Sequence, residues 1–435
     1  MNFKKSFELL EKSKQFIPGQ TQTFSRASTS FVEGAYPVYA QSAKGARMTD
    51  VDGNEFLDYY LGLGPITLGY NYERVNHAVI NQLQNGILFS LPHPLEIELS
   101  ELISKHVKNA EMVKFEKSGS NALTGAVRAA RAYTERDKIA YCGSAGVWHD
   151  WQAIMVSRNK GVPKFNRDLI SVFNYNDTDG LEQIFKNNPN EIAAIVIEPT
   201  YLEKPNRDFF KKVRELANQN NSLLILDEVV TGFRFDIGGG QKYFDIDGDL
   251  ICFGKGIANG FPLSAITGKK EFMKIFDELW VSSTNNSETL SLAAGISTIN
   301  EINEKQTIPY CWNLGTKLFD GWNKTAEKYG INAKMIGYPV RMTMKCYDSK
   351  NNESIFLKSL ILQELIKKGI FMSPGPTFIS YSHTENDISY TINSLDEIFK
   401  KISSITTNDN FANFLEGNIP KTIWTMAMKP VNKIN

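Results

Sequence analysis

The sequence predicts an α/β protein with a large domain built on a mostly parallel central sheet and a small α+β domain. Three observations predict this fold class. The 435 residues exceed the length of one ordinary domain, and their composition, 42% hydrophobic and 22% charged, is that of a globular protein. Apolar runs alternate with helical patterns from about residue 70 to 310. After residue 310 this order changes.

Residues 1–65 are predicted to form an N-terminal segment that packs with the small domain. Residues 4–16 have the pattern of a short helix, which Pro18 and Gly19 end. Residues 45–60 predict a β-hairpin, because extended residues flank a typical turn dipeptide, Asp52–Gly53.

Residues 66–310 are predicted to form the large domain. Its buried strands are expected in five short apolar runs: "KIAYCG", "LISVFNY", "IAAIVIEP", "LLILDEVV" and "LICFGKG". Helices are expected between them at 119–135, 178–187 and 207–220. Crossovers between parallel strands place helices on both faces of a sheet, so this alternation predicts a mainly parallel sheet. Ligands of such sheets bind at the carboxyl ends of the strands.

Residues 311–405 are predicted to form the small α+β domain. Helical patterns and apolar runs follow one another there in the order helix 310–328, strands 332–347, helix 354–368, the run "GIFMSP" and helix 385–403. Residues 406–435 have weak periodicity, and we expect them to form an appended C-terminal tail.

Charge and cysteine content argue against several classes of partner. Basic and acidic residues number 48 each, so the whole-protein field does not favour nucleic acid or an anionic membrane. The four cysteines lie far apart without CxxC spacing, so we expect neither a metal site nor disulfides, and a reducing cytoplasm. No apolar stretch resembles a signal peptide or a membrane span, and we expect a cytoplasmic protein.

Asp227 ends the apolar run "NSLLILDEVV", which places its carboxylate at the carboxyl end of a predicted strand. For such an acid alone, a structural salt bridge is the simpler reading. A Walker B strand is another, but it needs a Walker A partner. Around Lys255 the first glycine of that motif is replaced by Asp249, and Gly256 stands where Ser or Thr is required. The sequence contains no other match.

Ser118, Gly119 and Ser120 lie between an apolar strand and an alanine-rich helix in "VKFEKSGSNALTGAVRAARAYTERD". Small residues at a helix start let backbone N–H groups approach an anion, and the helix dipole favours a phosphate there. A simple helix cap remains the alternative for these residues.

Together these features match the needs of a pyridoxal phosphate enzyme. Such an enzyme requires a phosphate cradle, a buried carboxylate for the pyridine nitrogen and a lysine that forms a Schiff base with the cofactor aldehyde. Lys255 follows Asp227 by 28 residues within a glycine-rich stretch, where a bulky ring can lie against the backbone. We therefore interpret Lys255 as the covalent lysine.

Three stretches resemble class III (fold type I) aminotransferases, most closely their glutamate-1-semialdehyde 2,1-aminomutase-like branch. They are "LILDEVVTGFRF", "FGKGIANGFPLSAITGKKEFM" and "FEKSGSNALTGAVRAARAYTERDKI". "IPGQTQTFSRA" and "SHTENDISYTINSLDEIF" are similar to that branch too, so the resemblance covers roughly residues 10–403. It implies fold type I, pyridoxal 5′-phosphate as cofactor, and a homodimer with the active site at the subunit interface.

The resemblance also implies roles for matching residues. Lys255 would move the proton between the substrate Cα and the cofactor, and Asp227 would pair with the pyridinium. Further cofactor-binding positions would be Ser118, Gly119, Ser120, Trp148, Glu198, Val229 and Thr284, with Thr284 reaching the phosphate of the neighbouring subunit. Val229 as an ordinary core residue and Glu198 as an ion-pair acid are the simpler alternatives.

The sequence departs from the family pattern at the ring-covering position. An aromatic–His pair is usual after the strand "KIAYCG", whereas Ser144 and Ala145 stand there in this sequence. Trp148 or His149 could cover the ring instead; a core position for Trp148 is the other reading. The polar run Asn285–Ser287 replaces an "FGG" or "SGN" element of the family.

The most specific function that we predict is amino transfer from an amino acid donor to a keto or aldehyde acceptor, in the manner of branch members from amino-sugar or polysaccharide pathways. Arg26 and Thr23 lie where the aminomutase has a carboxylate-binding Arg and a Ser, although an exposed Arg near a terminus is commonly solvated. The segment 373–383 lacks the acidic residue of the aminomutase. Intramolecular amino transfer of the aminomutase type and a cofactor-binding protein with little turnover are the alternatives.

Overall fold

The computed structural model of the protein describes residues 1–143, 148–156, 158–200, 202–405 and 410–420. These residues form two compact units. The large unit is Glu73–Ile308, and the second unit combines Met1–Tyr72 with the described residues from Pro309 on. Each unit is described by itself below.

The large unit is built on a seven-stranded sheet with the strand order β4-β10-β9-β8-β7-β5-β6. The strands are β4 (Met112–Glu116), β5 (Lys138–Cys142), β6 (Ile170–Phe173), β7 (Ile192–Ile197), β8 (Leu223–Glu228), β9 (Leu250–Phe253) and β10 (Ser264–Gly268). Strands β5 to β9 pair in parallel, whereas β10 is antiparallel to both of its neighbours. The predicted, mostly parallel sheet is confirmed.

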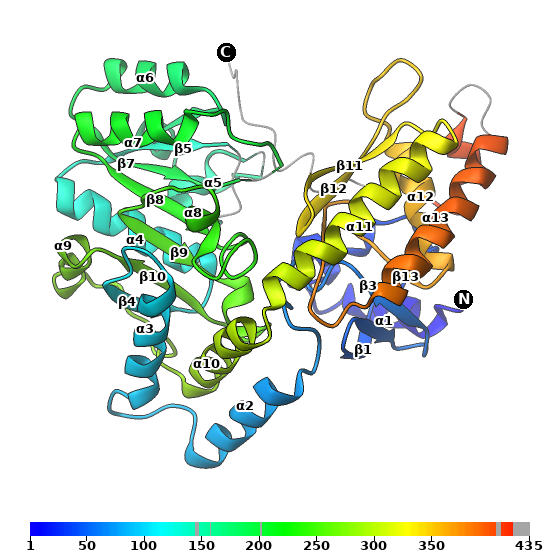
Figure 1. Ribbon diagram of the computed structural model, residues 1–435, viewed down its shortest axis with the longest axis horizontal. Helices are drawn as coiled ribbons and strands as arrows, with labels where there is room; N and C mark the ends of the chain where they lie inside the picture. Colours follow the sequence, from blue (N-terminus) through cyan, green and yellow to red (C-terminus); the bar gives the residue numbers. More distant parts are fainter. Residues whose placement is uncertain (144–147, 157, 201, 406–409, 421–435) are drawn as a thin grey trace. The chain divides into compact units, whose positions relative to one another are not determined.

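Helices cover this sheet because the crossover connections carry them. Helix α4 (Gly119–Thr134) packs on β4, β7, β8, β9 and β10, and α7 (Phe209–Gln219) packs on β8, with α6 (Thr178–Asn187) beside α7 (Figure 1). The other helices of the unit are α2 (Glu73–Asn85), α3 (Pro94–His106), α5 (Asp150–Ala153), α8 (Gly239–Tyr243), α9 (Lys270–Met273) and α10 (Thr289–Glu304).

The core of the large unit follows the two-residue period of the strands. Leu223 and Ile225 of β8 and Leu250 and Cys252 of β9 join the alanines of α4 in one hydrophobic cluster. The intervening residues, such as Leu224, are also fully buried and point to the opposite face of the sheet. Both faces are therefore covered, which explains why these strands are continuous apolar runs in the sequence.

The second unit contains two smaller sheets. One has the order β1-β2-β3-β13 and the other β11-β12-β14. The strands are β1 (Ala40–Lys44), β2 (Arg47–Asp50), β3 (Glu55–Asp58), β11 (Ala333–Tyr338), β12 (Arg341–Cys346), β13 (Ile370–Phe371) and β14 (Pro376–Phe378). The helices are α1 (Lys4–Ser13), α11 (Thr307–Lys328), α12 (Ile355–Lys367) and α13 (Glu385–Ile405). In the part of the chain that the structure describes, none of the helices has the length and apolar character that a bilayer crossing requires.

The predicted helices and strands agree with the structure to within a few residues, including the hairpin of β2 and β3. Strand β10 was not among the predicted strands, although its residues lie in the glycine-rich stretch after Lys255. Its apolar residues Ala265 and Ile266 follow Pro262, and the preceding glycines and proline obscure the strand pattern.

His383 is a titratable group in the core of the second unit. Its ring is fully buried and stacks on Tyr59 with 4.7 Å between the ring centroids. Nδ1 accepts a hydrogen bond from the backbone N–H of Ser380 at 3.1 Å and lies 2.9 Å from the Ser380 hydroxyl. Burial lowers the pKa of His383 from its usual 6.5 to about 4, because the charged form loses its hydration.

We predict that His383 makes the second unit sensitive to acid. Its contribution is fully present above pH 6.5 and is lost as the pH falls towards 4, because the unfolded chain binds the proton first. The loss should be on the order of 2–3 kcal/mol. Thermal unfolding of wild type and His383→Asn between pH 7 and pH 4 checks this, with His77→Asn, at an exposed histidine, as the control. Equal pH dependence in all three proteins would contradict the prediction.

Candidate active site

The carboxyl end of β8 presents two acids on opposite sides of the sheet. Residues 223, 225 and 227 share one strand face, because side chains alternate along a strand. Leu223 and Ile225 belong to the cluster beneath α4, so Asp227 lies on the α4 side. Its Oδ1 accepts a hydrogen bond from the backbone N–H of Val229 at 3.1 Å. Asp227 is half-buried at this strand end.

Val229 is the point where three chain segments meet. A Cβ atom added to Gly119, at the start of α4, would lie 2.6 Å from Cγ2 and 2.7 Å from Cγ1 of Val229. A Cβ added to Gly254, at the end of β9, would lie 3.3 Å from Cγ1 of Val229 and 3.7 Å from the backbone of Gly119. The strand end carrying Asp227, the start of α4 and the residue before Lys255 are therefore in contact.

The start of α4 is shaped to receive an anion. The N–H of Asn121 donates to Ser118 Oγ at 3.2 Å, and the N–H of Ala122 donates to Ser118 O at 3.0 Å. Within the described residues the N–H groups of Gly119 and Ser120 have no protein partner, as is usual for the first turn of a helix. Ser264 Oγ donates to Ser118 O at 2.8 Å and so fixes this turn to β10.

Lys255 is held in a strained backbone conformation. Its φ of +41° lies in the left-handed region, which non-glycine residues rarely adopt. Lys255 begins a short 3₁₀ turn, Lys255–Ala258, and the next residue, Asn259, also has a positive φ of 44°. Strain of this kind persists where the surrounding structure imposes it, and it is common at functional sites. The side chain of Lys255 is half-buried.

Glu198 lies at the end of β7, the neighbour of β8 in the sheet. It is half-buried. Burial raises the pKa of Tyr141 well above its usual value, and the negative charges of Asp227 and Glu198 raise it further. Both carboxylates therefore act on the same buried phenol of β5, which places Glu198 on the same edge of the sheet as Asp227.

Glu228 is a site residue that sequence reasoning missed. Its carboxylate is fully buried and accepts hydrogen bonds from the N–H groups of Gly240 and Gln241, at 2.7 and 2.5 Å, and from the Thr231 hydroxyl. Burial is the main cause that raises the pKa of Glu228 to about 7, and the charge of Asp227 adds to it. In the sequence Glu228 is the second acid of the Asp–Glu pair. Because side chains alternate along a strand, Glu228 lies on the face opposite Asp227.

His149 is tied to α4 by a hydrogen-bonded chain. Trp151 Nε1 donates to Thr124 Oγ1 at 2.8 Å, and Thr124 Oγ1 lies 2.6 Å from His149 Nδ1. In the neutral ring either nitrogen can carry the proton, and the Thr124 hydroxyl donates to Nδ1 or accepts from it accordingly. Burial lowers the pKa of His149, which favours this neutral form.

Trp148 is not a core residue, because 73% of its side chain is exposed. Its ring lies edge-on to that of His149, with 4.2 Å between centroids. A core position for Trp148 is therefore wrong. Ser144 and Ala145, which stand at the predicted ring-covering position, lie outside the described residues.

Thr284 lies in an exposed turn before α10. An ion pair joins the base of this turn to the residue that follows β4. In this pair Lys117 Nζ lies 2.9 Å from Glu288 Oε1. Glu288 also caps α10 by accepting from the N–H groups of Leu290 and Ser291. The structure brings the turn near the start of α4 and leaves Thr284 exposed.

Arg26 and Thr23 belong to the second unit. Arg26 is exposed, and its Nη2 donates to Gly62 O at 3.1 Å. The N–H of Thr23 donates to Thr21 Oγ1 at 3.2 Å in a tight local turn. The structure thus places both residues in one loop and places the other predicted site residues in the large unit.

The large-unit residues form a coherent set of chemical groups. An anion can bind at the start of α4, an amine and a carboxylate flank it at Lys255 and Asp227, and the side chain of Val229 offers an apolar surface between them. This set suits an anionic ligand that contacts an amine, a carboxylate and an apolar surface.

Comparison with known proteins identifies relatives over nearly the whole chain. The family model for aminotransferase class-III matches residues 30–402. The 3-aminobutyryl-CoA aminotransferase of Cloacimonas acidaminovorans (strain Evry) is 35% identical, over 92% of this chain and 98% of its own. The glutamate-1-semialdehyde 2,1-aminomutase of Alkaliphilus oremlandii (strain OhILAs) is 34% identical, over 91% of this chain and 98% of its own.

Among solved structures, the PLP internal aldimine form of the FumI protein from Sphingopyxis sp. MTA144 has a TM-score of 0.87 and 24% identity. The likeness covers 96% of this chain and 99% of that one. At this identity the likeness shows the fold, and it confirms the predicted fold class.

We predict that the contact of Gly119 with Val229 limits what the site tolerates. Gly119→Ala should lower the free energy of unfolding by about 1–3 kcal/mol, because its Cβ overlaps the stiff Val229 side chain. Val229→Ala removes both overlapping methyl groups, so the double variant should recover most of that loss. A double-mutant cycle of thermal unfolding measures the coupling, and strictly additive effects would contradict the predicted contact.

Proposed function

The chain belongs to the class-III aminotransferase family, whose enzymes depend on pyridoxal phosphate, and from this premise we propose that it transfers an amino group from an amino acid donor to a keto or aldehyde acceptor. The meeting of Gly119, Val229 and Gly254 is the observation that carries this proposal. It brings an anion-binding helix start, the strand end of Asp227 and the residue before Lys255 into contact.

The residues of this site fit the cofactor. The N–H groups of Gly119 and Ser120, with the Ser118 and Ser120 hydroxyls, would bind its phosphate, and Val229 would support the ring. The absence of a side chain at Gly119 and Gly254 leaves room for a ring against the backbone. When bound, pyridoxal phosphate supplies a carbonyl that bonds to amines and a ring that accepts the electrons released at the substrate Cα.

Lys255 and Asp227 have complementary tasks in this proposal. Lys255 Nζ would hold the cofactor through its carbonyl and, as a free amine, would take the proton from the donor Cα and pass it to the second reacting carbon. Proton transfer by a positioned group of this kind contributes roughly 10²- to 10⁴-fold to the rate. Asp227 would hold a proton on the ring nitrogen, and Glu198, at the same edge of the sheet, would be a further polar group of the site.

The cover over the ring is proposed to come from residues 148–149. His149 is held by Thr124, one helical turn beyond Ser120 on the same face of α4. Trp148 is in ring contact with it and has exposed surface available for a ligand or a second subunit.

The substrates are proposed from the predicted recognition residues. Arg26 would bind a substrate carboxylate and Thr23 would assist it, since both stand at positions where the aminomutase branch carries such groups. Intermolecular transfer is favoured because the segment 373–383 lacks the acidic residue of the aminomutase. Intramolecular transfer is the second candidate, supported by the 34% identity to the aminomutase of Alkaliphilus oremlandii. An amino-sugar or polysaccharide pathway stays a prediction.

A homodimer is proposed from an exposed apolar surface on the large unit. Its residues lie on α2, on α3 and between them: Ile80, Leu83, Ile87, Leu88, Phe89, Leu91 and Ile97. Leu91 is 77% exposed and Ile97 is 66% exposed. Exposed apolar side chains gathered in one stretch of the chain, residues 80–97, support a protein interface, and a second copy of the chain would cover them. In such a dimer the exposed Thr284 could reach the phosphate of the partner.

The cellular compartment and the domain boundaries also remain proposals. The four cysteines are buried and free, which supports a reducing compartment such as the cytoplasm. The grouping of residues 1–72 with those from 309 on supports the predicted domains, 66–310 as the large domain and 311–405 with 1–65 as the small one.

We predict that substitutions distinguish the role of Lys255 from that of Asp227. Lys255→Ala should abolish both covalent attachment of the cofactor and turnover. Asp227→Ala should retain the visible absorbance of the lysine-bound cofactor but lower kcat by about 10²- to 10⁴-fold, because the ring nitrogen loses its counter-charge. Absorbance spectra, mass spectrometry of the reduced protein and a screen of amino donors provide the measurements.

The control for this experiment is Lys305→Ala, at an exposed lysine, which should leave attachment and turnover intact. Normal turnover of Asp227→Ala would show that its assigned role is wrong. A cofactor band that no amino donor removes would favour the binding protein with little turnover. Isotope-labelled nitrogen that stays within one substrate molecule would favour the aminomutase.

We predict that Leu91→Asp weakens the dimer, because a buried charge without a partner is strongly unfavourable at an apolar interface. Analytical ultracentrifugation should show a shift to the monomer, with a matching loss of activity as Thr284 loses its target. Phe165→Asp, at an exposed apolar residue outside this surface, is the control. A Leu91→Asp protein that stays dimeric and active would argue against this surface.

A further inference from the structure

We propose that residues 410–420, the C-terminal segment, act as a brace for residues 23–36, the N-terminal loop, and thereby position Arg26 and Thr23 for substrate. The inference rests on the proposed function for the role of these two residues. It assigns a task to a part of the chain that the sequence presents only as an appended tail. Each contact that supports it lies within the second unit.

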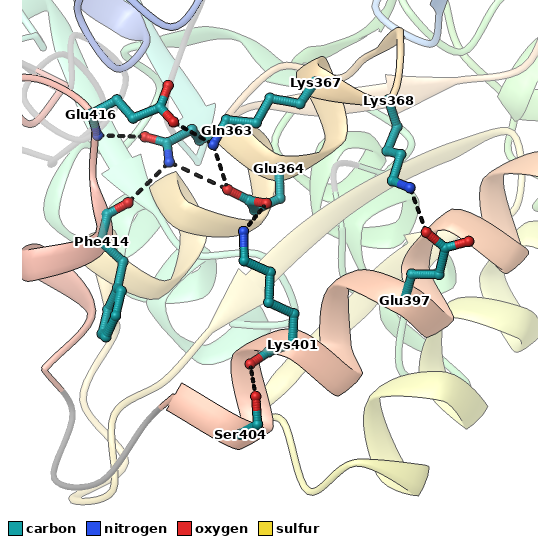
Figure 2. A network of polar contacts seen from close by, with 9 residues as sticks. All are labelled: Gln363, Glu364, Lys367, Lys368, Glu397, Lys401, Ser404, Phe414 and Glu416. Atoms are coloured by element: carbon teal, nitrogen blue, oxygen red, sulfur yellow. Dashed lines mark hydrogen bonds and ion pairs between the residues drawn. The ribbon is translucent and has the colours of Figure 1, made fainter.

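The C-terminal segment is held on α12 by a buried glutamine. Gln363 Nε2 donates to Phe414 O at 3.0 Å, and the N–H of Glu416 donates to Gln363 Oε1 at 2.8 Å (Figure 2). One side-chain amide therefore pairs with a carbonyl and an N–H two residues apart, as a neighbouring β-strand would. Gln363 is fully buried in the middle of an apolar helix sequence, where an amide without partners would be costly.

Ion pairs and an aromatic side chain strengthen this attachment. Lys367 Nζ lies 2.5 Å from Glu416 Oε1 and 2.7 Å from Glu364 Oε1, and Lys401 Nζ approaches Glu364 Oε2 from α13 at 2.7 Å (Figure 2). Phe411, in the short turn Phe411–Phe414, is 6% exposed. The C-terminal segment is thus packed against the unit and does not merely follow it in sequence.

The other side of the C-terminal segment meets the N-terminal loop at Glu33. Asn418 Nδ2 donates to Glu33 Oε2 at 2.7 Å, and the N–H of Glu33 donates to Asn418 O at 3.4 Å. A Cβ added to Gly417 would lie 1.9 Å from Glu33 O, so only glycine permits this approach. The contact is backbone to backbone as well as side chain to side chain.

Consecutive tight turns connect Glu33 to Arg26. The turns Phe24–Arg26 and Ser28–Ser30 are followed by the hydrogen bond from Ala35 N to Val32 O. Val32 is 2% exposed and Phe31 stacks on Tyr36 at 4.5 Å, so this part of the loop is packed.

Near Arg26 the loop has two further anchors. Tyr60 OH donates to Ser25 O at 3.1 Å, and Arg26 Nη2 donates to Gly62 O. Neither anchor is reached by the C-terminal segment. The brace at Glu33 therefore fixes the far end of the same loop, and its release should loosen Arg26 without removing any contact of Arg26 itself.

The test compares two brace variants with a control at Lys368, the C-terminal cap of α12. Gln363→Ala removes both bonds to the C-terminal segment, and Glu33→Ala removes the side-chain bond to Asn418 at an exposed residue, which guards against a failure to fold. Lys368→Ala removes the ion pair with Glu397 on the neighbouring face and leaves the brace intact (Figure 2).

The readouts are amide hydrogen exchange and steady-state kinetics of the full-length holoenzyme. Both brace variants should exchange residues 28–36 about tenfold faster than wild type, and Lys368→Ala should not. KM for a carboxylate donor should rise about three- to tenfold with kcat nearly unchanged, while an amine donor without a carboxylate keeps its KM.

Arg26→Gln separates this inference from the proposed function. If Arg26→Gln raises KM and the brace variants do not, the brace does not position Arg26 and the inference is wrong. If Arg26→Gln leaves KM unchanged, its proposed substrate role fails, and hydrogen exchange alone decides the brace. Unchanged exchange of residues 28–36 in both brace variants would overturn the inference in either case.

Discussion

The candidate site depends on one steric constraint, the contact between the backbone of Gly119 and the side chain of Val229. There is no room for a Cβ at Gly119, so the first turn of α4 lies directly on the residue that follows the end of β8. Gly254 lies on the other side of the same valine, which fixes the backbone leading into Lys255. Three segments that are distant in the sequence are thus positioned by packing, and a flat ligand can bind where side chains are missing.

The two acids at the end of β8 lie in different environments because of the strand geometry. Asp227 and Glu228 are neighbours in the sequence, yet the two-residue period of the strand directs them to opposite faces. Asp227 lies on the α4 face beside Val229, where a ligand can reach it. Glu228 is enclosed by the N–H groups of α8 and the Thr231 hydroxyl, and it holds the chain that returns from the strand end. One acid is thus enclosed by hydrogen bonds, and its neighbour stays half-buried on the α4 face.

Much of this architecture could be predicted because its signals are local. The strands from β5 to β9 are apolar runs, the start of α4 carries a capping serine, and the family resemblance, which is confirmed, follows from short motifs. The hydrogen-bonded chain from Trp151 through Thr124 to His149 could not be predicted, since it joins residues about one helix and one strand apart. The same holds for Gln363, whose partners lie more than 50 residues away and whose sequence context is an ordinary apolar helix. The assigned roles of the individual site residues stay predictions.

The C-terminal segment illustrates why low periodicity is a poor guide to function. Residues 410–420 bury few apolar side chains of their own, so they give no helical or strand pattern, and they are held mainly by backbone groups and one glutamine. Backbone hydrogen bonds leave no trace in the identity of the residues that make them. If substrate recognition depends on a loop at one end of the chain, a segment from the other end can adjust that recognition without touching the cofactor residues. Differences in substrate among related enzymes could then arise from the chain termini while the chemistry of the large unit stays the same.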